Sequence, residues 1–219
     1  MLPENIKAVI FDVDGTLLDS LDVWADSDRI FLESLGHSYD PSISDRMKSM
    51  HYISAAQLLI DEYHIAMPLE EVMTRIEDIV RDKYFHEVPV KPFALEFIAD
   101  CKLRGIRMCA ATSNLRTLAE GALSSGKILP QLDFIITSDE VGSSKDDPEI
   151  FFRCAEKLGA APCDTAVFED SIHAAVSAAG AGFYTVGVYD KHYASEFEEL
   201  KKICSRTVMS FEELIRKDV

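Results

Sequence analysis

Short apolar runs alternate with helical periodicities over most of this chain. The runs are rich in β-branched and aromatic residues and predict buried strands at residues 8–11, 106–111, 134–137, 165–168 and 183–188. Between the runs, apolar residues recur every three or four positions, which predicts amphipathic helices, including a terminal pair that covers residues 211–215. Because strands and helices alternate, we expect an α/β fold in which helices cover both faces of a doubly wound parallel sheet.

Helical periodicity alone fills the stretch after the first run. Four helices are expected there, at residues 20–35, 42–50, 53–63 and 69–85, and no strand pattern interrupts them. We therefore expect an α/β core made of residues 1–18 and 89–219, with residues 19–88 forming an inserted helical domain. Pro89 and Pro92 lie at the second boundary of this domain, where they stiffen the connection.

Polar residues follow the strands at the points where the strands end. Those that could carry chemistry are Asp12, Asp14, Thr112, Ser113, Asn114, Lys145, Glu169 and Asp170. In an open parallel sheet the carboxyl ends of the strands share one edge, and ligands bind outside that edge. Each residue alone has an ordinary explanation, such as a helix cap or a solvated loop position. Together, four acids, one ammonium group and several hydroxyls suit a metal-bound phosphate better than a protein core.

Composition narrows the class of protein. Hydrophobic residues make up 47% of the 219 residues and charged residues 27%, as in an ordinary globular protein. The formal net charge of −16 argues against binding to nucleic acid or to an anionic membrane, so an anionic substrate must be attracted by a metal and by local cations. The N-terminal sequence MLPENIK lacks an apolar signal region, and no run is long enough to span a membrane, so a cytoplasmic location is expected.

The five cysteines are odd in number, scattered along the chain and never in CxxC spacing. This pattern predicts buried or half-buried reduced thiols, and it indicates neither disulfides nor a zinc site.

The segment AVIFDVDGTLLDS, residues 8–20, carries the most specific motif. Its Asp-x-Asp-Gly spacing is half of a calcium-binding EF-hand loop, but the glycine comes too early, and Val23 stands where that loop needs glutamate. The DxDGT sequence after an apolar strand instead resembles the first motif of the haloacid dehalogenase (HAD) superfamily of phosphohydrolases. Thr112 after MCAA, Lys145, and Glu169-Asp170 after AVF match the second, third and fourth motifs of that superfamily.

The resemblance covers nearly the whole chain and implies a Rossmann-like core. The helical insertion directly after the first motif is similar to the subclass with an α-helical cap, which includes phosphoglycolate phosphatases and proteins like beta-phosphoglucomutase. One loop departs from the family pattern, since KDDPEIF replaces the KPxPxxF form of relatives. Asp146 takes the place of proline there, and Asp147 adds charge close to Lys145.

The resemblance implies that Asp12 is a nucleophile that forms an aspartyl-phosphate. Asp14 would protonate the leaving alcohol and later take a proton from the hydrolytic water. An acid at this position favours phosphate esters, because an alkoxide leaving group needs a proton. Dehalogenases and phosphonate hydrolases of the superfamily lack this acid.

A magnesium ion is the expected cofactor, because a phosphate dianion repels a carboxylate until a hard cation neutralises the charge. The resemblance implies that its ligands are the carboxylates of Asp12 and Asp170 and the backbone carbonyl of Asp14. Glu169 would be a further ligand or would bind metal waters. Lys145 would neutralise the phosphate and keep Asp12 ionised.

Three neighbouring residues are expected to hold the phosphoryl oxygens. The hydroxyl of Thr112 and the backbone amides near Ser113 and Asn114 would donate to them, helped by the start of the following helix.

The cap is expected to close over the site, exclude water and select the leaving group. Its candidates for substrate binding are Trp24, Arg46, Lys48 and His51, although such residues also occur as helix packing or solvated surface. The expected partner is a small phosphorylated metabolite such as a sugar phosphate or phosphoglycolate. The sequence predicts no particular oligomeric state.

Two other functions stay open from the sequence. Phosphosugar mutases that resemble this chain usually carry a histidine where Trp24 stands, and a cap arginine that holds the second phosphate. Residues 50–53 contain His51 but no arginine, which favours a phosphatase. A non-enzymatic phosphoaspartate switch resembling a response-regulator receiver also combines acids, a hydroxyl and a lysine on a doubly wound sheet. Such a receiver is shorter and lacks a helical cap.

Overall fold

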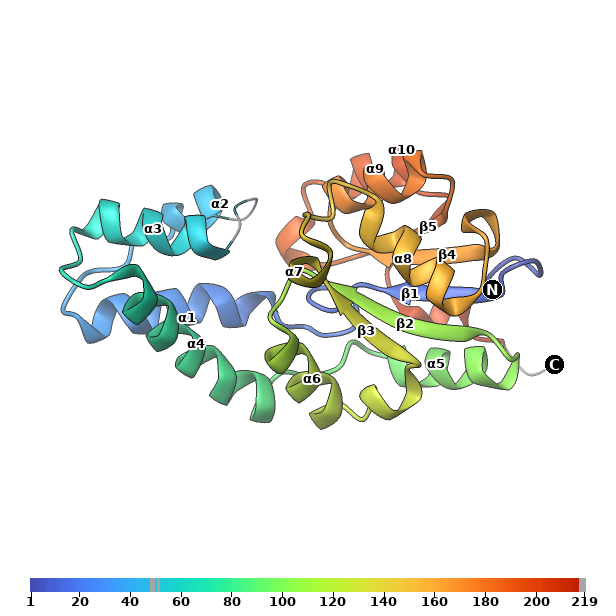
Figure 1. Ribbon diagram of the computed structural model, residues 1–219, viewed down its shortest axis with the longest axis horizontal. Helices are drawn as coiled ribbons and strands as arrows, with labels where there is room; N and C mark the ends of the chain where they lie inside the picture. Colours follow the sequence, from blue (N-terminus) through green and yellow to red (C-terminus); the bar gives the residue numbers. More distant parts are fainter. Residues whose placement is uncertain (48–49, 51, 217–219) are drawn as a thin grey trace. The chain divides into compact units, whose positions relative to one another are not determined.

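The computed structural model describes residues 1–47, 50 and 52–216 and, of residues 24, 25 and 45, the backbone alone. Contacts between residues divide the chain into two compact units, Met1–Ser20 with Val88–Val219, and Leu21–Glu87. Figure 1 traces both units. That residues 19–88 form an inserted helical cap domain stays a prediction.

The larger unit contains a sheet of six parallel strands in the order β3-β2-β1-β4-β5-β6. The strands are β1 (Ala8–Phe11), β2 (Arg107–Thr112), β3 (Phe134–Thr137), β4 (Thr165–Glu169), β5 (Tyr184–Val188) and β6 (Arg206–Val208). Phe11 of β1 is in register with Ala110 of β2 on one side and with Phe168 of β4 on the other. The predicted doubly wound parallel sheet is therefore confirmed, and the strand order reverses between β1 and β4, where ligands bind in such sheets.

The end of the chain differs from the predicted helical pair. Helix α10 (Phe197–Ile203) is followed by the three-residue strand β6 and then by a 3-10 turn, Phe211–Leu214, in place of an α-helix. Strand β6 has no apolar run to mark it, and it exists because its backbone pairs with β5. Backbone pairing of this kind depends on a neighbouring strand and not on a local pattern.

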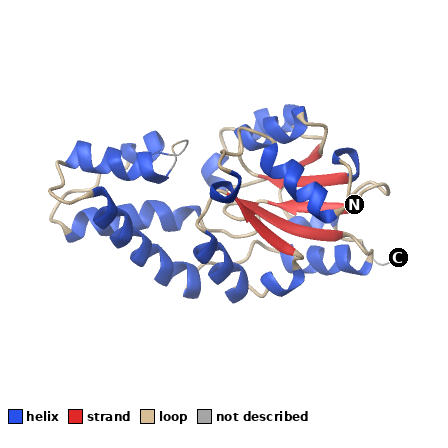
Figure 2. Ribbon diagram, viewed as in Figure 1, coloured by secondary structure: helices blue, strands red, loops and turns tan. Residues whose placement is uncertain are grey.

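Helices cover both faces of the sheet (Figures 1 and 2). Helices α8 (Glu149–Leu158) and α9 (Ile172–Gly180) pack with Ala8 and Ile10, whose side chains point to one face of β1. Helix α5 (Ala94–Leu103) lies on the other face, and Figure 1 draws α6 (Arg116–Ser125) on the same side. The alternation of inward side chains along a buried strand explains why both faces are apolar.

Four phenylalanines hold the face that α5 covers. Phe11 and Phe168 come from adjacent strands, Phe97 from α5, and Phe211 from the terminal 3-10 turn. The ring centroids of Phe11 and Phe168 are 5.1 Å apart, and those of Phe97 and Phe168 are 5.3 Å apart. Since Phe11 directly precedes Asp12, this aromatic cluster anchors the strand that delivers the first motif.

The regular secondary structure among the described residues of the smaller unit is helical. It consists of α1 (Leu21–Ser34), α2 (Ser42–Met47), α3 (Tyr52–Tyr63) and α4 (Leu69–His86). Helix α4 buries Val72, Ile76, Val80 and Tyr84, one residue per turn of the helix. This spacing is the amphipathic pattern that the sequence predicts.

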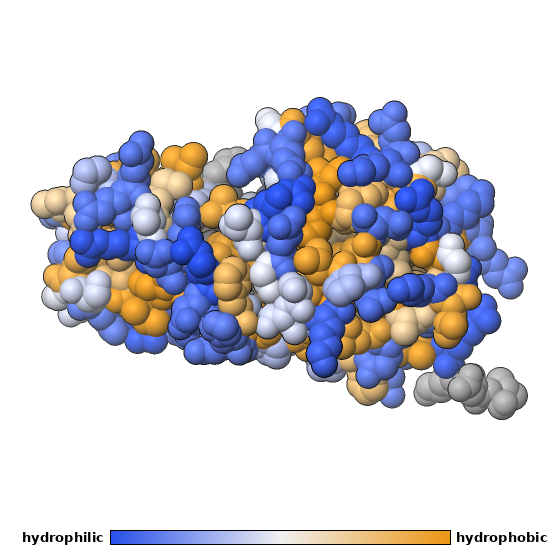
Figure 3. Space-filling view, turned by 60° about the horizontal axis from the view of Figure 1, so that its bottom comes forward, coloured by the Kyte–Doolittle hydropathy of each residue, from blue (hydrophilic) through white to orange (hydrophobic). Residues whose placement is uncertain are grey.

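Polar and apolar side chains are interspersed over the face of the molecule in Figure 3. Within the described part of the chain, no helix has the length and apolar character needed to cross a membrane. All five cysteines are free thiols, as predicted. Cys163 is exposed, contrary to the expected burial, because it lies in the 3-10 turn Pro162–Asp164 ahead of β4.

Candidate active site

Three carboxylates meet where the strand order reverses. Asp12 follows β1, Glu169 ends β4, and Asp170 follows it. The backbone N–H of Asp12 still donates to the carbonyl of Phe168 at 2.9 Å, so the two chains remain paired as they leave the sheet. One oxygen from each of the three carboxylates lies within 4.8 Å of the others, and all three residues are buried. The pairing of β1 with β4 thus brings together acids that are more than 150 positions apart.

Lys145 reaches the same place from the loop after β3. A capping box formed by Thr137 and Glu140 starts the short helix α7 (Ser138–Val141), and Gly142 ends it with a φ of 80°, which favours glycine. Lys145 follows this turn and is 7% exposed. Its Nζ donates to Asp12 Oδ1 and, at 2.8 Å, to Glu169 Oε1. This lysine therefore joins the nucleophile candidate to the fourth motif.

The departure from the family loop pattern leaves Lys145 in place. Asp146 is exposed and accepts a hydrogen bond from Ser144 Oγ at 3.2 Å. Asp147 Oδ1 accepts from the backbone N–H of Glu149 at 2.9 Å, at the start of α8. Asp146 Oδ1 also lies 4.0 Å from His173 Nδ1, and neither aspartate forms an ion pair with Lys145.

Burial and neighbouring charges oppose each other at these groups. Burial by itself would lower the pKa of Lys145, but the carboxylates of Asp12 and Glu169 outweigh it, so the pKa is raised and the lysine stays charged. Burial raises the pKa of Glu169 to about 8, with Asp12 adding to the effect and Lys145 opposing it. Burial and then the charges of Asp12, Glu169 and Asp190 raise the pKa of Asp170 well above its usual range. One lysine therefore does not compensate for all the acids.

These residues fit a hard divalent cation. Asp12 Oδ2 and Asp170 Oδ2 are buried and have no hydrogen-bond partner among the described residues. Buried carboxylate oxygens without a partner are costly, and oxygen donors in a cluster of this charge are the ligands that Mg²⁺ takes in proteins. Asp12, Glu169 and Asp170 are therefore the side chains that could hold such an ion. The metal contact predicted for the backbone carbonyl of Asp14 stays a prediction.

Asp14 is held by two hydrogen bonds at the edge of this cluster. Ser20 Oγ donates to Asp14 Oδ1 at 2.6 Å, and Asn114 Nδ2 donates to Asp14 Oδ2 at 3.0 Å. Gly15 has a φ of 86°, so the chain can turn sharply directly after Asp14, and the N–H of Gly15 donates to the carbonyl of Leu18 at 2.9 Å. The carboxyl group of Asp14 is thus positioned by residues from two loops.

The second motif presents one buried hydroxyl. Thr112 is 1% exposed, and its Oγ1 accepts the backbone N–H of Asn114 at 3.0 Å, so its hydroxyl hydrogen can still donate. The side chain of Asn114 is occupied at both ends, since its Oδ1 accepts from the N–H of Leu115 at 2.8 Å while Nδ2 binds Asp14. Ser113 is exposed, with its Oγ 3.2 Å from Ser138 Oγ. Thr112 and Ser113 therefore lie ahead of α6, and their role as donors to phosphoryl oxygens stays a prediction.

The structure adds three residues that the sequence analysis did not single out. Thr16 Oγ1 donates to Asp170 Oδ1 at 3.1 Å, and Ser20 binds Asp14 as described above. Asp190, 2% exposed, directly follows Tyr189 after β5. The sequence analysis took polar residues that follow a predicted strand as site candidates, and the same rule applied to the predicted strand at residues 183–188 would have selected Asp190. Thr16 and Ser20 could not, because small hydroxyl residues in a turn have many ordinary roles.

Of the four cap residues predicted to bind substrate, the structure describes the side chain of Arg46. Arg46 is exposed at the end of α2, where its Nη1 pairs with Glu62 Oε2 at 2.9 Å. Trp24 lies in α1, but its side chain, together with Lys48 and His51, lies outside the described residues. The substrate-binding role of all four stays a prediction.

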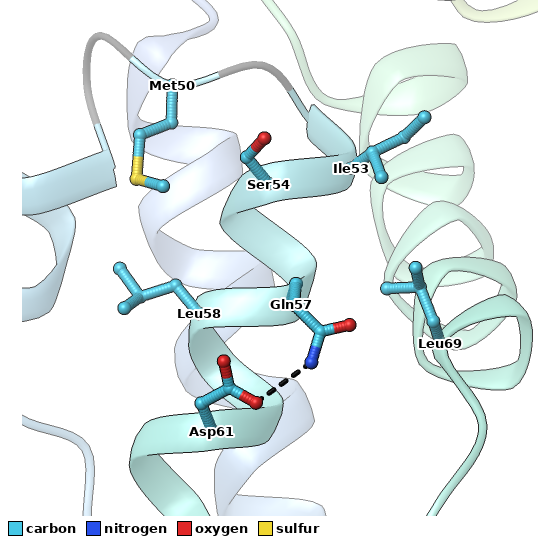
Figure 4. A pocket seen from close by; sticks show the side chains of 7 residues that line it. All are labelled: Met50, Ile53, Ser54, Gln57, Leu58, Asp61 and Leu69. Atoms are coloured by element: carbon cyan, nitrogen blue, oxygen red, sulfur yellow. Dashed lines mark hydrogen bonds between the residues drawn. The ribbon is translucent and has the colours of Figure 1, made fainter.

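A hollow of about 380 Å³ lies on the helical unit, beside α3 (Figure 4). It is lined by Met50, Ile53, Ser54, Gln57, Leu58, Asp61 and Leu69. Gln57 Nε2 donates to Asp61 Oδ1 at 2.8 Å, which ties together its two longest polar side chains. None of the residues proposed for catalysis lines this hollow.

Known proteins resemble the chain over nearly its full length. A family model described as haloacid dehalogenase-like hydrolase matches residues 6–182. The phosphorylated carbohydrates phosphatase of Thermotoga maritima is 27% identical over 81% of this chain and 82% of the relative. Hexitol phosphatase B of Escherichia coli K12 is 25% identical over 85% of each chain. The crystal structure of beta-phosphoglucomutase from Clostridium difficile has a TM-score of 0.75 at 20% identity, covers 95% of this chain and 93% of its own, and shows likeness of fold.

Proposed function

The chain belongs to the haloacid dehalogenase-like hydrolases, and on that basis we propose that it is a Mg²⁺-dependent phosphatase of small phosphomonoesters. The observation that carries the proposal is the contact of Lys145 with both Asp12 and Glu169, next to Asp170, at the reversal point of the sheet. A nucleophile, a compensating cation and further oxygen ligands for a metal are thereby within reach of one phosphoryl group.

The first half of the reaction would use Asp12 and Asp14. A carboxylate oxygen of Asp12 attacks phosphorus, the bond from phosphorus to the ester oxygen breaks, and a proton from Asp14 goes to that oxygen. The product is an alcohol and a phosphorylated Asp12. Ser20 and Asn114 support this step because their hydrogen bonds hold the carboxyl group of Asp14 in one orientation.

The second half would release phosphate. Asp14, now ionised, takes a proton from a water molecule, whose oxygen attacks phosphorus while the bond to Asp12 breaks. Lys145 stays charged through both halves, since its pKa is raised, and it compensates for the negative charge on Asp12 and on the phosphoryl group. The hydroxyl of Thr112 donates to a phosphoryl oxygen.

Mg²⁺ would be held by Asp12 and Asp170, with Glu169 and the backbone carbonyl of Asp14 as further ligands. When bound, it would neutralise the carboxylates and the phosphate dianion, so that like charges no longer keep them apart.

The substrate class follows from the relatives. Proteins named phosphorylated carbohydrates phosphatase and hexitol phosphatase B match more than four fifths of the chain. This supports a sugar phosphate or a similarly small phosphorylated metabolite. We expect the cap residues Trp24, Arg46, Lys48 and His51 to contact the part of the substrate that leaves. A cytoplasmic location stays a prediction.

A mutase is the less favoured function. A beta-phosphoglucomutase shares the fold, but at 20% identity this likeness supports the fold alone. Trp24 stands where such mutases usually carry histidine, which favours hydrolysis.

The test is a phosphatase assay on p-nitrophenyl phosphate and a panel of sugar phosphates, with Mg²⁺ or with EDTA. We expect phosphate release that needs Mg²⁺ and that falls by at least about a thousandfold in Asp12→Asn, a variant that still folds. Equal release by wild type and Asp12→Asn would contradict the proposal. Turnover of a hexose phosphate only when a bisphosphate primer is added would favour the mutase.

A further inference from the structure

The two chain segments that lead into and out of residues 21–87 are paired with each other within the larger unit. The N–H of Asp19 donates to the carbonyl of Pro89 at 3.0 Å, and the N–H of Lys91 donates to the carbonyl of Leu17 at 2.8 Å. Leu18 and Val90 form an antiparallel bridge between these bonds. We call residues 17–19 with 89–91 the paired connections.

A buried ion pair attaches the paired connections to the end of β5. Lys91 Nζ donates to Asp190 Oδ2 at 2.5 Å and to the carbonyl of Tyr189 at 3.3 Å. The side chain of Asp190 is fully buried, and that of Lys91 is 13% exposed. The other oxygen of Asp190 accepts the backbone N–H of His192 at 2.8 Å. Both oxygens of Asp190 are thus satisfied, and a buried carboxylate needs such compensation.

The two hydroxyl groups that contact the proposed catalytic acids belong to the residues on either side of Leu17–Asp19. Thr16 is the residue before Leu17, is fully buried, and donates to Asp170 Oδ1 at 3.1 Å. Ser20 is the residue after Asp19, is fully buried, and donates to Asp14 Oδ1 at 2.6 Å. A shift of the paired connections would therefore move both donors at once.

We propose that Lys91 is a positioning residue. Its ion pair with Asp190 holds the paired connections at the catalytic edge, so that Thr16 orients Asp170 and Ser20 orients Asp14. This inference rests on the proposed function, because it concerns the same acids. It assigns Lys91 no contact with the substrate.

The inference predicts a specific defect. Loss of the hold on Asp14 weakens proton donation to the leaving group, which matters for an alkyl phosphate but little for p-nitrophenyl phosphate, whose leaving group needs almost no proton. Loss of the hold on Asp170 weakens Mg²⁺ binding. A general loss of folded protein would lower both rates equally.

The test compares Lys91→Met, Lys91→Arg and the double variant Lys91→Met/Asp190→Asn. The double variant has no buried unpaired charge, so it keeps the test valid if Lys91→Met fails to fold. The control is Lys7→Met. Lys7 directly precedes β1, at the end of the strand away from Asp12, and its Nζ forms an ion pair of 2.7 Å with Asp164 Oδ2. Three quantities are measured: kcat on p-nitrophenyl phosphate, kcat on a sugar phosphate, and Mg²⁺ affinity by calorimetry without substrate.

We expect the double variant, and Lys91→Met where it folds, to bind Mg²⁺ about tenfold more weakly and to lose about tenfold more kcat on the sugar phosphate than on p-nitrophenyl phosphate. Lys91→Arg should recover most of both losses, and Lys7→Met should match wild type. A double variant with wild-type Mg²⁺ affinity and a wild-type ratio of the two kcat values would overturn the inference. If wild type hydrolyses no phosphomonoester, the proposed function fails, and calorimetry alone decides this inference.

Discussion

The catalytic edge and the helical unit both bury acidic side chains, but the ion pairs and hydrogen bonds around those side chains differ. At the edge, Asp12 and Glu169 share the ammonium group of Lys145, and Asp170 accepts a hydrogen bond from Thr16. In the helical unit, Asp28 of α1 is 7% exposed, and no described residue gives it a hydrogen bond or an ion pair. Burial alone raises the pKa of Asp28 to about 7.

The difference lies in what surrounds each buried acid. At the edge, Lys145 opposes the rise in the pKa of Glu169, but burial and the neighbouring carboxylates still raise the pKa of Glu169 and Asp170, and this excess of negative charge suits a divalent cation. Among the described residues Asp28 has no cation paired with it, and at moderately acid pH it avoids the cost of burial by taking up a proton. Burial of a carboxylate by itself is therefore weak evidence for a functional site, and the candidate site is marked instead by several acids gathered around one cation.

Removal of the Lys145 ammonium group should have the largest effect on the free energy of unfolding. Lys145→Met leaves Asp12 and Glu169 buried without compensation, and we expect the free energy of unfolding to fall by about 3–5 kcal/mol at pH 7.5. The loss should shrink as the pH is lowered, because protonation removes the uncompensated charges. Urea unfolding at several pH values measures this.

Lys201→Met is the control for that variant, since Lys201 forms an exposed pair with Glu198. It should change the free energy of unfolding by less than about 0.5 kcal/mol. A loss in Lys145→Met that is equally small, or that grows on acidification, would show that Lys145 does not compensate the acids.

Burial of Asp28 in the helical unit should make the free energy of unfolding depend on pH. Its pKa is 3.8 when unfolded and about 7 when folded, so the folded state holds the proton more tightly. The penalty for burying it is absent below about pH 4, grows as the pH rises to 7, and is then constant. Relative to Asp28→Asn, which cannot ionise, wild type should lose on the order of 2–4 kcal/mol over this range.

Urea unfolding of wild type and Asp28→Asn at pH 4, 5.5, 7 and 8 gives that difference directly. Asp82→Asn, at an exposed position of α4, is the matched control and should follow wild type at every pH. Parallel curves for wild type and Asp28→Asn would mean that Asp28 is compensated after all.

Mg²⁺ should raise the free energy of unfolding by binding at the catalytic edge and not at Asp28. At a concentration a hundredfold above its dissociation constant, we expect Mg²⁺ to add about 2.7 kcal/mol to the free energy of unfolding of wild type. Asp28→Asn should show the same gain, and Asp170→Asn should lose most of it. Thermal unfolding with Mg²⁺ and with EDTA measures this, and an equal gain in Asp170→Asn would exclude Asp170 as a ligand.

The smallest effect is expected at Arg46, whose pair with Glu62 is about half exposed on both sides. Arg46→Met should change the free energy of unfolding by less than about 0.5 kcal/mol. If Arg46 binds the substrate as predicted, KM for the sugar phosphate should rise severalfold while kcat on p-nitrophenyl phosphate stays constant. An unchanged KM across the substrate panel would remove Arg46 from the binding site.

Local patterns in the sequence determined the fold class and most of the candidate site. Apolar runs ending in Asp12, Thr112 and Glu169 mark strands and their carboxyl ends, and the parallel sheet then places those ends along one edge. Period and residue type are properties of a short segment, so they can be read without knowing what lies beside it.

The tertiary structure alone decided the contacts that depend on a neighbour far away in the chain. Strand β6 forms because its backbone pairs with β5. Lys91 pairs with Asp190, which lies 99 positions further along the chain. The contact of Thr16 with Asp170 and the burial of Asp28 likewise follow from which segments pack together. Hydrogen bonds, ion pairs and burial act over a few ångströms in space, and separation along the chain does not report that distance.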